Sequence, residues 1–337
     1  ARLLETAAGI PYTYGLIIFG VSIALYTAIG GFRASVLNDA LQGLVMLLGT
    51  VILLVAIIYH AGGLPAAIEK MHTIDPKLVS PEGADDILSG PFLASFWVLV
   101  CFGVIGLPHT AVRCISYKDS KAVHRGIILG TIVMAILMFG MHFAGALGRA
   151  ILPDLTIPDQ VIPTLMVQVL PPFAAGIFLA APMAAIMSTI NAQLLQSSAT
   201  IVKDIYLNTM PTQIKNEKRL ARISSLSTLV LGALLLVAAW NPPQMIIWLN
   251  LLAFGGLEAV FLWPLVLGLY WEKANGTGAI SGMVIGGISY AILASFKIEI
   301  MGFHAIVPSL IFSLIAFLLG NLFGKNPVQS PANEQVT

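Results

Sequence analysis

Long apolar runs recur along the whole chain, and each is about long enough to cross a membrane. A helix needs about 20 apolar residues to span a hydrocarbon layer of roughly 30 Å. Nine runs meet this requirement, and each predicts a transmembrane helix: 13–31, 37–60, 92–112, 126–148, 173–202, 222–240, 245–271, 278–296 and 305–323. The pattern therefore predicts an all-α integral membrane protein with about nine transmembrane helices.

The composition agrees with a membrane protein. Hydrophobic residues make up 58% of the chain and charged residues only 10%, and the mean hydropathy is +0.91. Soluble domains are about one quarter charged, so water is not the main solvent of this chain. A net charge of +1 offers no basic surface for nucleic acid. Cys101 and Cys114 fall on one predicted span about 20 Å apart, too far for a disulfide.

The distribution of Lys and Arg predicts the orientation. If the loops at 113–125 and 203–222 face the cytoplasm, twelve basic residues lie inside and five outside, which together make the 17 in the chain. The positive-inside rule favours this arrangement. It places the acidic loop 62–91 outside and the polar tail, 325–337, in the cytoplasm.

This orientation also places the first residues outside the cell. The chain begins at Ala1, and no basic segment followed by a cleavable apolar core precedes the first span. We therefore expect the chain to be the C-terminal portion of a longer protein. An odd-numbered bundle with an external N-terminus is the alternative.

One predicted helix carries a polar face at membrane depth. Ala185, Ser188 and Thr189 are spaced i, i+3 and i+4, so they share one side of a helix. Two hydroxyls and a backbone carbonyl are oxygen ligands that suit a hard cation such as Na⁺. Hydroxyls in membrane helices also bond back to their own backbone or join helices, so a structural role is the alternative.

Four motifs carry a resemblance to a known family. They are "GGFRASVLNDALQGLVM" at 30–46, "GLPHTAVR" at 106–113, "AAPMAAIMSTINAQLLQSSATIVKDIY" at 180–206 and "LGLYWEKANGTGAISG" at 267–282. In this order they resemble the signature segments of the solute:sodium symporter family. The wording of "LLETAAGIPY" and "GADDILS" is most similar to the bacterial members that import pantothenate.

The resemblance implies an inverted-repeat (LeuT-like) transporter fold that is incomplete at the N-terminus. It implies the following organisation: the end of the first inverted repeat, with core helices 4 and 5, at 1–61; a periplasmic loop at 62–91; the second repeat, with core helices 6 to 10, at 92–271; two peripheral helices at 272–324; and a cytoplasmic tail at 325–337. It implies a symporter of the bacterial inner membrane that takes up pantothenate, uses Na⁺ as coupling ion and needs no cofactor.

The resemblance also implies roles for single residues in ion transport. Ala185, through its carbonyl, and Ser188 and Thr189, through their hydroxyls, match sodium ligands of the family. Asp39 matches an acidic residue on the path by which sodium leaves, although Asn38 stands where the family usually has Thr. A helix beginning near residue 38 would explain Asp39 equally well as a capping residue.

Two further sets of residues are candidates. The resemblance places Trp97, Cys101 and Val104 towards the substrate cavity, whereas ordinary packing is the alternative. Glu258 lies near the middle of the span 245–271, where an acid is costly and function is the default hypothesis. It is a coupling or gating candidate, or it stays protonated and bonds across a helix interface.

The chain has no motif of a metalloprotease, of a serine hydrolase or of a P-loop ATPase, which predicts that it is not an enzyme. Alternative functions are symport of another small solute (proline, a sugar or a monocarboxylate), a sensor-type membrane domain, or a truncated product that does not transport.

Overall fold

The structure is a computed structural model that describes residues 1–81, 83, 89–209, 217–241 and 246–324. These residues form helices throughout, and their β-pairing is limited to an isolated bridge between Ile300 and Phe303. Seven of the described helices are long and apolar enough to cross a membrane, or eight if one bent helix pair counts as a span. The predicted cytoplasmic tail, 325–337, lies outside the described residues.

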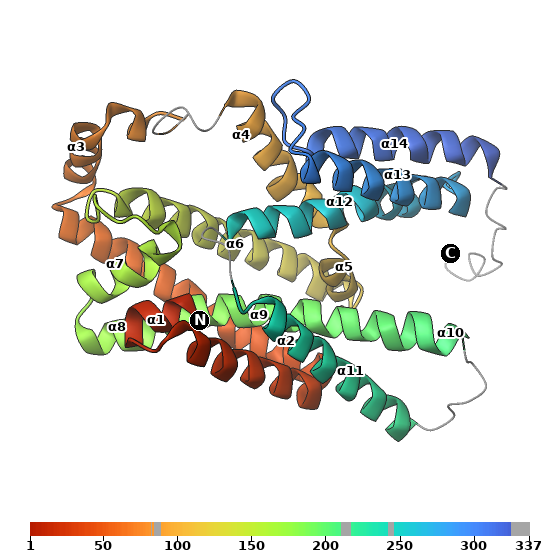
Figure 1. Ribbon diagram of the computed structural model, residues 1–337, viewed down its shortest axis with the longest axis horizontal. Coiled ribbons are helices and arrows are strands. Elements are labelled where there is room, and N and C mark those ends of the chain that lie inside the picture. Colours follow the sequence, from red (N-terminus) through yellow and green to blue (C-terminus); the bar gives the residue numbers. More distant parts are fainter. Residues whose placement is uncertain (82, 84–88, 210–216, 242–245, 325–337) are drawn as a thin grey trace. The chain divides into compact units, whose positions relative to one another are not determined.

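The chain divides into two compact units. The first unit comprises Ala1–Val79 and Lys118–Ile246, and the second comprises Ser80–Tyr117 and Ile247–Thr337. The helices of the first unit are α1 (Arg2–Ala8), α2 (Tyr12–Ala61), α3 (Leu64–Ile74), η1 (Pro76–Val79), α6 (Ser120–Gly148), η5 (Pro158–Gln160), α7 (Val161–Val169), α8 (Pro172–Phe178), α9 (Ala180–Ala199), η6 (Thr200–Tyr206), α10 (Leu207–Thr209) and α11 (Glu217–Ala238). Those of the second unit are α4 (Gly90–Trp97), η3 (Val98–Phe102), η4 (Gly103–Gly106), α5 (Pro108–Cys114), α12 (Ile247–Tyr270), α13 (Gly276–Ser295) and α14 (Ile306–Phe323). Figure 1 labels the longer elements.

Helix α2 differs from the prediction of two separate spans. It runs for 50 residues and is interrupted only at Gly31, where φ is 60° and ψ is −164°. A side chain disfavours this backbone conformation, so glycine permits the kink without a loop. At 1.5 Å per residue the helix is about 75 Å long, which is more than twice the hydrocarbon thickness. Asp39 therefore lies inside α2, and the prediction that it caps a helix beginning near residue 38 is wrong.

The predicted span 92–112 is broken in the structure. Helix α4 continues into η3, a π-helical turn, and η4, a 3₁₀ turn, before α5 starts at Pro108. The two halves of this broken span are bent by 52°. Pro108 has no amide N–H and fixes the first turn of α5, which accounts for the position of the bend. One helix at α2 in place of two, together with this broken span, explains why seven or eight spans replace the predicted nine.

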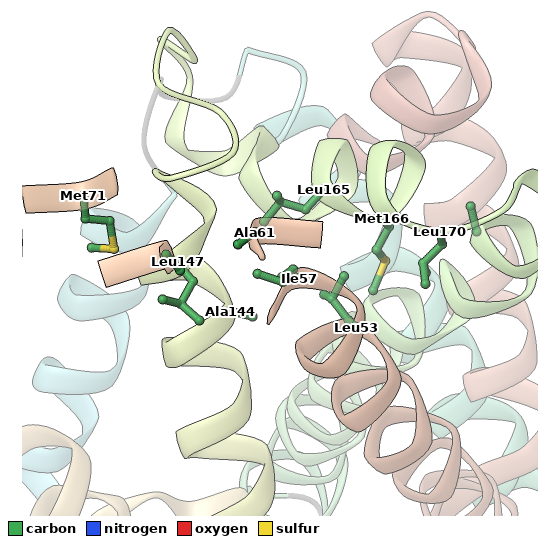
Figure 2. Close-up of a cluster of buried hydrophobic side chains, with 11 residues drawn as sticks. Leu53, Ile57, Ala61, Met71, Ala144, Leu147, Leu165, Met166 and Leu170 are labelled. Carbon is green, nitrogen blue, oxygen red and sulfur yellow. The ribbon is translucent and has the colours of Figure 1, made fainter. Parts of the chain in front are cut away.

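Two short helices in the first unit lie where loops were predicted. The segment 62–91 contains α3, whose Ala67 and Met71 are buried one turn apart, and the segment after α6 contains α7. Figure 2 shows how these short helices meet α2 and α6 around an apolar cluster, whose buried members are Leu53, Ile57, Ala61, Ala67, Met71, Ala144, Leu147, Leu165, Met166, Leu170 and Ala175. The Lys70 ammonium group also donates to the carbonyl of Ala61, at the end of α2. Burial of this cluster orders α3 and α7, because short helices are marginal without tertiary packing.

The second unit is built around α12. Helix α12 packs against η3, η4, α13 and α14, and α13 and α14 run side by side (Figure 1). Polar groups at these contacts are satisfied across helices: the Tyr290 hydroxyl donates to the carbonyl of Leu251 at 2.8 Å, and the Trp263 indole donates to the carbonyl of Leu310 at 2.8 Å. The loop after α13 is tied to α4 by a bond from the His304 amide to the Ser95 hydroxyl.

Candidate functional site

Helix α9 brings the three predicted sodium ligands to one point. The hydroxyls of Ser188 and Thr189 both donate to the carbonyl oxygen of Ala185, each at 3.0 Å. Ser188 is half-buried and Thr189 is exposed. Three oxygen atoms therefore converge on one side of the helix, as their spacing predicted. A cation can use all three, because each hydroxyl rotates its hydrogen away and presents a lone pair.

Bonds of this type also occur elsewhere in the protein. The Ser22 hydroxyl donates to the carbonyl of Ile18 at 2.6 Å, and the Thr131 hydroxyl donates to the carbonyl of Ile127 at 2.7 Å. Hydroxyls in membrane helices commonly bond to the carbonyl one turn earlier. The geometry at Ala185 fits a sodium site and an ordinary helix equally well. Among the described residues, no three His, Cys, Asp or Glu side chains gather into a metal-binding group.

A polar chain joins α9 to α2 beside this point. Asn191 is fully buried, and its side chain accepts a bond from the Thr27 hydroxyl at 3.0 Å and donates to the Ser35 hydroxyl. Ser35 in turn donates to an Asp39 carboxylate oxygen at 3.5 Å. Asn191 stands three residues after Ser188, so the two side chains are neighbours on the helix surface. The chain of contacts thus leads from the predicted sodium ligands to the predicted exit residue.

Sequence reasoning placed Asp39 and the Ser188–Thr189 pair but missed Thr27 and Ser35. These two residues lie eight apart on α2 on either side of the Gly31 kink, and both contact Asn191, which is 164 and 156 residues further along the chain. The only sequence signal was the polar cluster that follows Thr189, since an amide at membrane depth needs a partner.

The predicted substrate residues lie on the broken span of the second unit. Trp97, Cys101 and Val104 are spaced i, i+4 and i+7, and all three are exposed, Trp97 by 69%. The opposite face carries Leu99, Gly103 and Gly106, which are buried. One face of the broken span is therefore packed and the other presents an aromatic ring, a thiol and an aliphatic group.

Glu258 lies on α12 against the packed face of the broken span. Its side chain is fully buried, and a Cβ atom added to Gly103 would overlap its carboxyl group. Only glycine allows α12 this close to the turn between η3 and η4. The sequence drew attention to Glu258 through the cost of an acid in the membrane, but gave no sign of its contact with Gly103.

Comparisons with known proteins match nearly the whole chain. The model of the sodium:solute symporter family matches residues 1–286. The chain is 76% identical over 330 residues to the sodium/pantothenate symporter of Escherichia coli (strain K12), which covers 98% of the chain and 68% of that relative. It is 61% identical to the sodium/pantothenate symporter of Haemophilus influenzae, with the same coverage. A solved structure of a Na⁺-coupled sialic acid symporter has the same fold, with a TM-score of 0.73, 20% identity, and coverage of 96% of this chain and 69% of that one.

Proposed function

Because the chain belongs to the sodium:solute symporter family, we propose that it imports pantothenate together with sodium across the bacterial inner membrane. The observation that carries this proposal is the high identity, over 98% of the chain, to sodium/pantothenate symporters of two bacteria. Membership of the family bears out the resemblance seen in the four sequence motifs. Symporters move solutes without covalent chemistry, which agrees with the absence of catalytic motifs from the sequence.

We place sodium at α9. The carbonyl of Ala185 and the hydroxyls of Ser188 and Thr189 supply three of its oxygen ligands, and this proposal is supported by their convergence within 3.0 Å. Asp39 receives the ion on its way to the cytoplasm, a role supported by the chain of polar contacts through Asn191 and Ser35. Neutral oxygens bind Na⁺ weakly enough for release, which a coupling ion requires.

We place the substrate at the exposed face of the broken span. Trp97, Cys101 and Val104 present apolar and weakly polar surface suited to the methyl groups and backbone of pantothenate, while broken helices expose backbone groups that bind polar parts of a solute. We further propose the predicted orientation, with the segment 62–91 in the periplasm and the C-terminus in the cytoplasm, and the predicted division into the inverted repeats at 1–61 and 92–271.

Uptake measurements test the function directly. The chain spans 68% of the E. coli relative, so uptake is measured with the chain itself and with a chimera in which it replaces the matched 330 residues of that relative. In cells that lack pantothenate uptake of their own, the chimera is expected to take up labelled pantothenate only when sodium is present outside. Excess proline, sugars and monocarboxylates should not compete.

Two results would contradict the proposal. Uptake that is indifferent to sodium would exclude symport, and competition by proline or another solute would favour a different member of the family. Comparison of the chain with the chimera also addresses the fragment and sensor alternatives, because a sensor binds its solute without accumulating it in either form.

Thiol labelling tests the placement of the substrate. Cys101 and Cys114 are both exposed free cysteines, so each reacts with a maleimide when the other is replaced by serine. Pantothenate is expected to slow the labelling of Cys101 in the Cys114→Ser variant several-fold, because the bound solute covers the thiol. The matched Cys101→Ser variant should label at Cys114 equally fast with and without pantothenate. Equal protection of both cysteines, or of neither, would remove Cys101 from the binding site.

A further inference from the structure

Glu258 has no countercharge in its surroundings. The elements that pack against α12 are η3, η4, α13 and α14, all of which the structure describes. None of these elements, nor α12 itself, contains a Lys, Arg or His residue. The titratable side chains that they bring towards this part of α12 are Cys101 of η3, which is exposed, and Tyr290 of α13, whose hydroxyl is already bonded to the carbonyl of Leu251. The carboxyl group is therefore buried without a cation to balance a negative charge.

A charged carboxylate in this position is strongly disfavoured. Neither oxygen of the Glu258 side chain has a hydrogen-bond donor beside it in the described structure. An ionised acid at membrane depth that is neither paired nor solvated becomes neutral by binding a proton. The neutral acid then has a hydrogen to donate and needs an acceptor.

The break in the neighbouring span supplies acceptors. The amide of Gly103 donates to the carbonyl of Val98, an i→i+5 bond, whereas the amide of Leu107 donates to the carbonyl of Val104, an i→i+3 bond. Between and including these bonds, the five amides of 103–107 serve the seven carbonyls of 98–104, so two carbonyl oxygens have no amide donor in the span. These free carbonyls belong to the turn against which the Glu258 carboxyl packs at Gly103.

We propose that Glu258 is a proton-binding site, which keeps its carboxyl group neutral and donates a hydrogen bond to a carbonyl that the η3–η4 break leaves free. A carbonyl accepts but does not donate, so this bond exists only when the acid carries its proton. The bond holds the packed face of the broken span, with Leu99, Gly103 and Gly106, against α12. It thereby fixes the direction of the opposite face, so Glu258 is a positioning residue for Cys101 and Val104. The last step rests on the proposed function, whereas the protonation of Glu258 does not.

Infrared spectroscopy of the purified chain tests the protonation without any substrate. The absorption of a protonated carboxyl group is expected at neutral pH in the wild type and should be lost in Glu258→Gln. The matched control, Glu299→Gln, removes an exposed carboxyl group in the same unit and should leave this band unchanged. A wild-type spectrum without the band at neutral pH, or a band that persists in Glu258→Gln, would overturn the proposal.

Thermal unfolding tests the hydrogen bond. Glutamine has nearly the shape of a neutral glutamic acid and an N–H that can donate in place of its O–H, so Glu258→Gln is expected to unfold within a few degrees of the wild type. Glu258→Leu removes the donor while filling the space, and should unfold at a clearly lower temperature because a carbonyl loses its partner. If Glu258→Gln destabilises the chain as much as Glu258→Leu does, or if neither has any effect, the donor role is wrong.

Uptake kinetics of the chimera test the positioning role. Glu258→Gln should keep its KM for pantothenate within about twofold of the wild type and its sodium dependence unchanged, whereas Glu258→Leu should raise the KM about tenfold, since the loss of one hydrogen bond in a binding site is worth about a factor of ten. Loss of sodium coupling in Glu258→Gln would instead identify Glu258 as a charged cation ligand. Failure of the proposed substrate would abolish uptake in every variant but leave the infrared and unfolding results intact, so the two failures are distinguishable.

Discussion

Replacing both Ser188 and Thr189 by alanine is expected to raise the sodium concentration that supports half-maximal uptake by about 100-fold. A hydrogen bond or dipole contact to a charged group contributes about 1.5–3 kcal/mol, and each 1.4 kcal/mol changes an equilibrium constant about tenfold. The loss of two hydroxyl ligands thus weakens sodium binding by a factor of about 100 or more. The measurement is pantothenate uptake by the chimera over a range of external sodium concentrations at constant ionic strength.

Two sets of controls separate ion binding from helix structure. Ser22→Ala with Thr131→Ala removes hydroxyls that make the same bond to the preceding turn, on α2 and α6, without approaching Ala185. This control pair should leave the sodium dependence unchanged. Thr189→Ser keeps the hydroxyl oxygen and should stay within a few-fold of the wild type. If the double alanine variant shows normal sodium dependence, the hydroxyls of α9 serve helix structure alone.

The hydrophobic pattern located most of the long helices within a few residues. The predicted spans 245–271, 278–296 and 305–323 correspond to α12, α13 and α14. This agreement has a simple cause: the membrane sets the length of an apolar helix, so length and hydropathy are enough to find it. Where the end of an element depends on something else, the prediction was less accurate. Gly31 bends α2 without ending it, and burial in the apolar cluster orders α3 inside a segment that is too short and polar to be a span.

The candidate site divides along the same line. Contacts within one helix follow from its 3.6-residue period, so the spacing of Ala185, Ser188 and Thr189 predicted the convergence of their oxygens. Contacts between helices depend on packing that no local pattern contains. Thr27 meets Asn191 across 164 residues, and Glu258 meets Gly103 across a boundary at which the backbone changes its hydrogen-bond register. The sequence indicates that such groups need partners, and the structure identifies the partners.

Replacing Asn191 by leucine is expected to destabilise the first unit by about 2–6 kcal/mol. The two side chains have similar volume, so the change removes hydrogen bonds with little effect on packing. It leaves the Thr27 hydroxyl without its acceptor and the Ser35 hydroxyl without its donor, and each buried unsatisfied group costs about 1–3 kcal/mol. The measurement is the thermal or denaturant-induced unfolding of the purified chain in detergent.

Asn208→Leu is the matched control. The Asn208 amide donates to the carbonyl of Asp204, one turn earlier, and is exposed, so water replaces the lost partner. This variant should unfold at the wild-type temperature. Equal effects of the two asparagine substitutions would show that the loss in Asn191→Leu comes from leucine itself and not from the bonds to α2.

A triple variant isolates the cause of the expected loss. In Thr27→Val with Ser35→Ala and Asn191→Leu, the partners of the lost amide are also apolar, so no hydroxyl of this cluster is left unsatisfied. Removing both sides of a buried hydrogen bond is close to neutral, whereas removing one side is costly. The triple variant should therefore recover most of the stability that Asn191→Leu loses. If it is less stable than the single variant, the polar groups between α2 and α9 contribute through packing, and the chain of hydrogen bonds from Asn191 towards Asp39 does not hold these helices together.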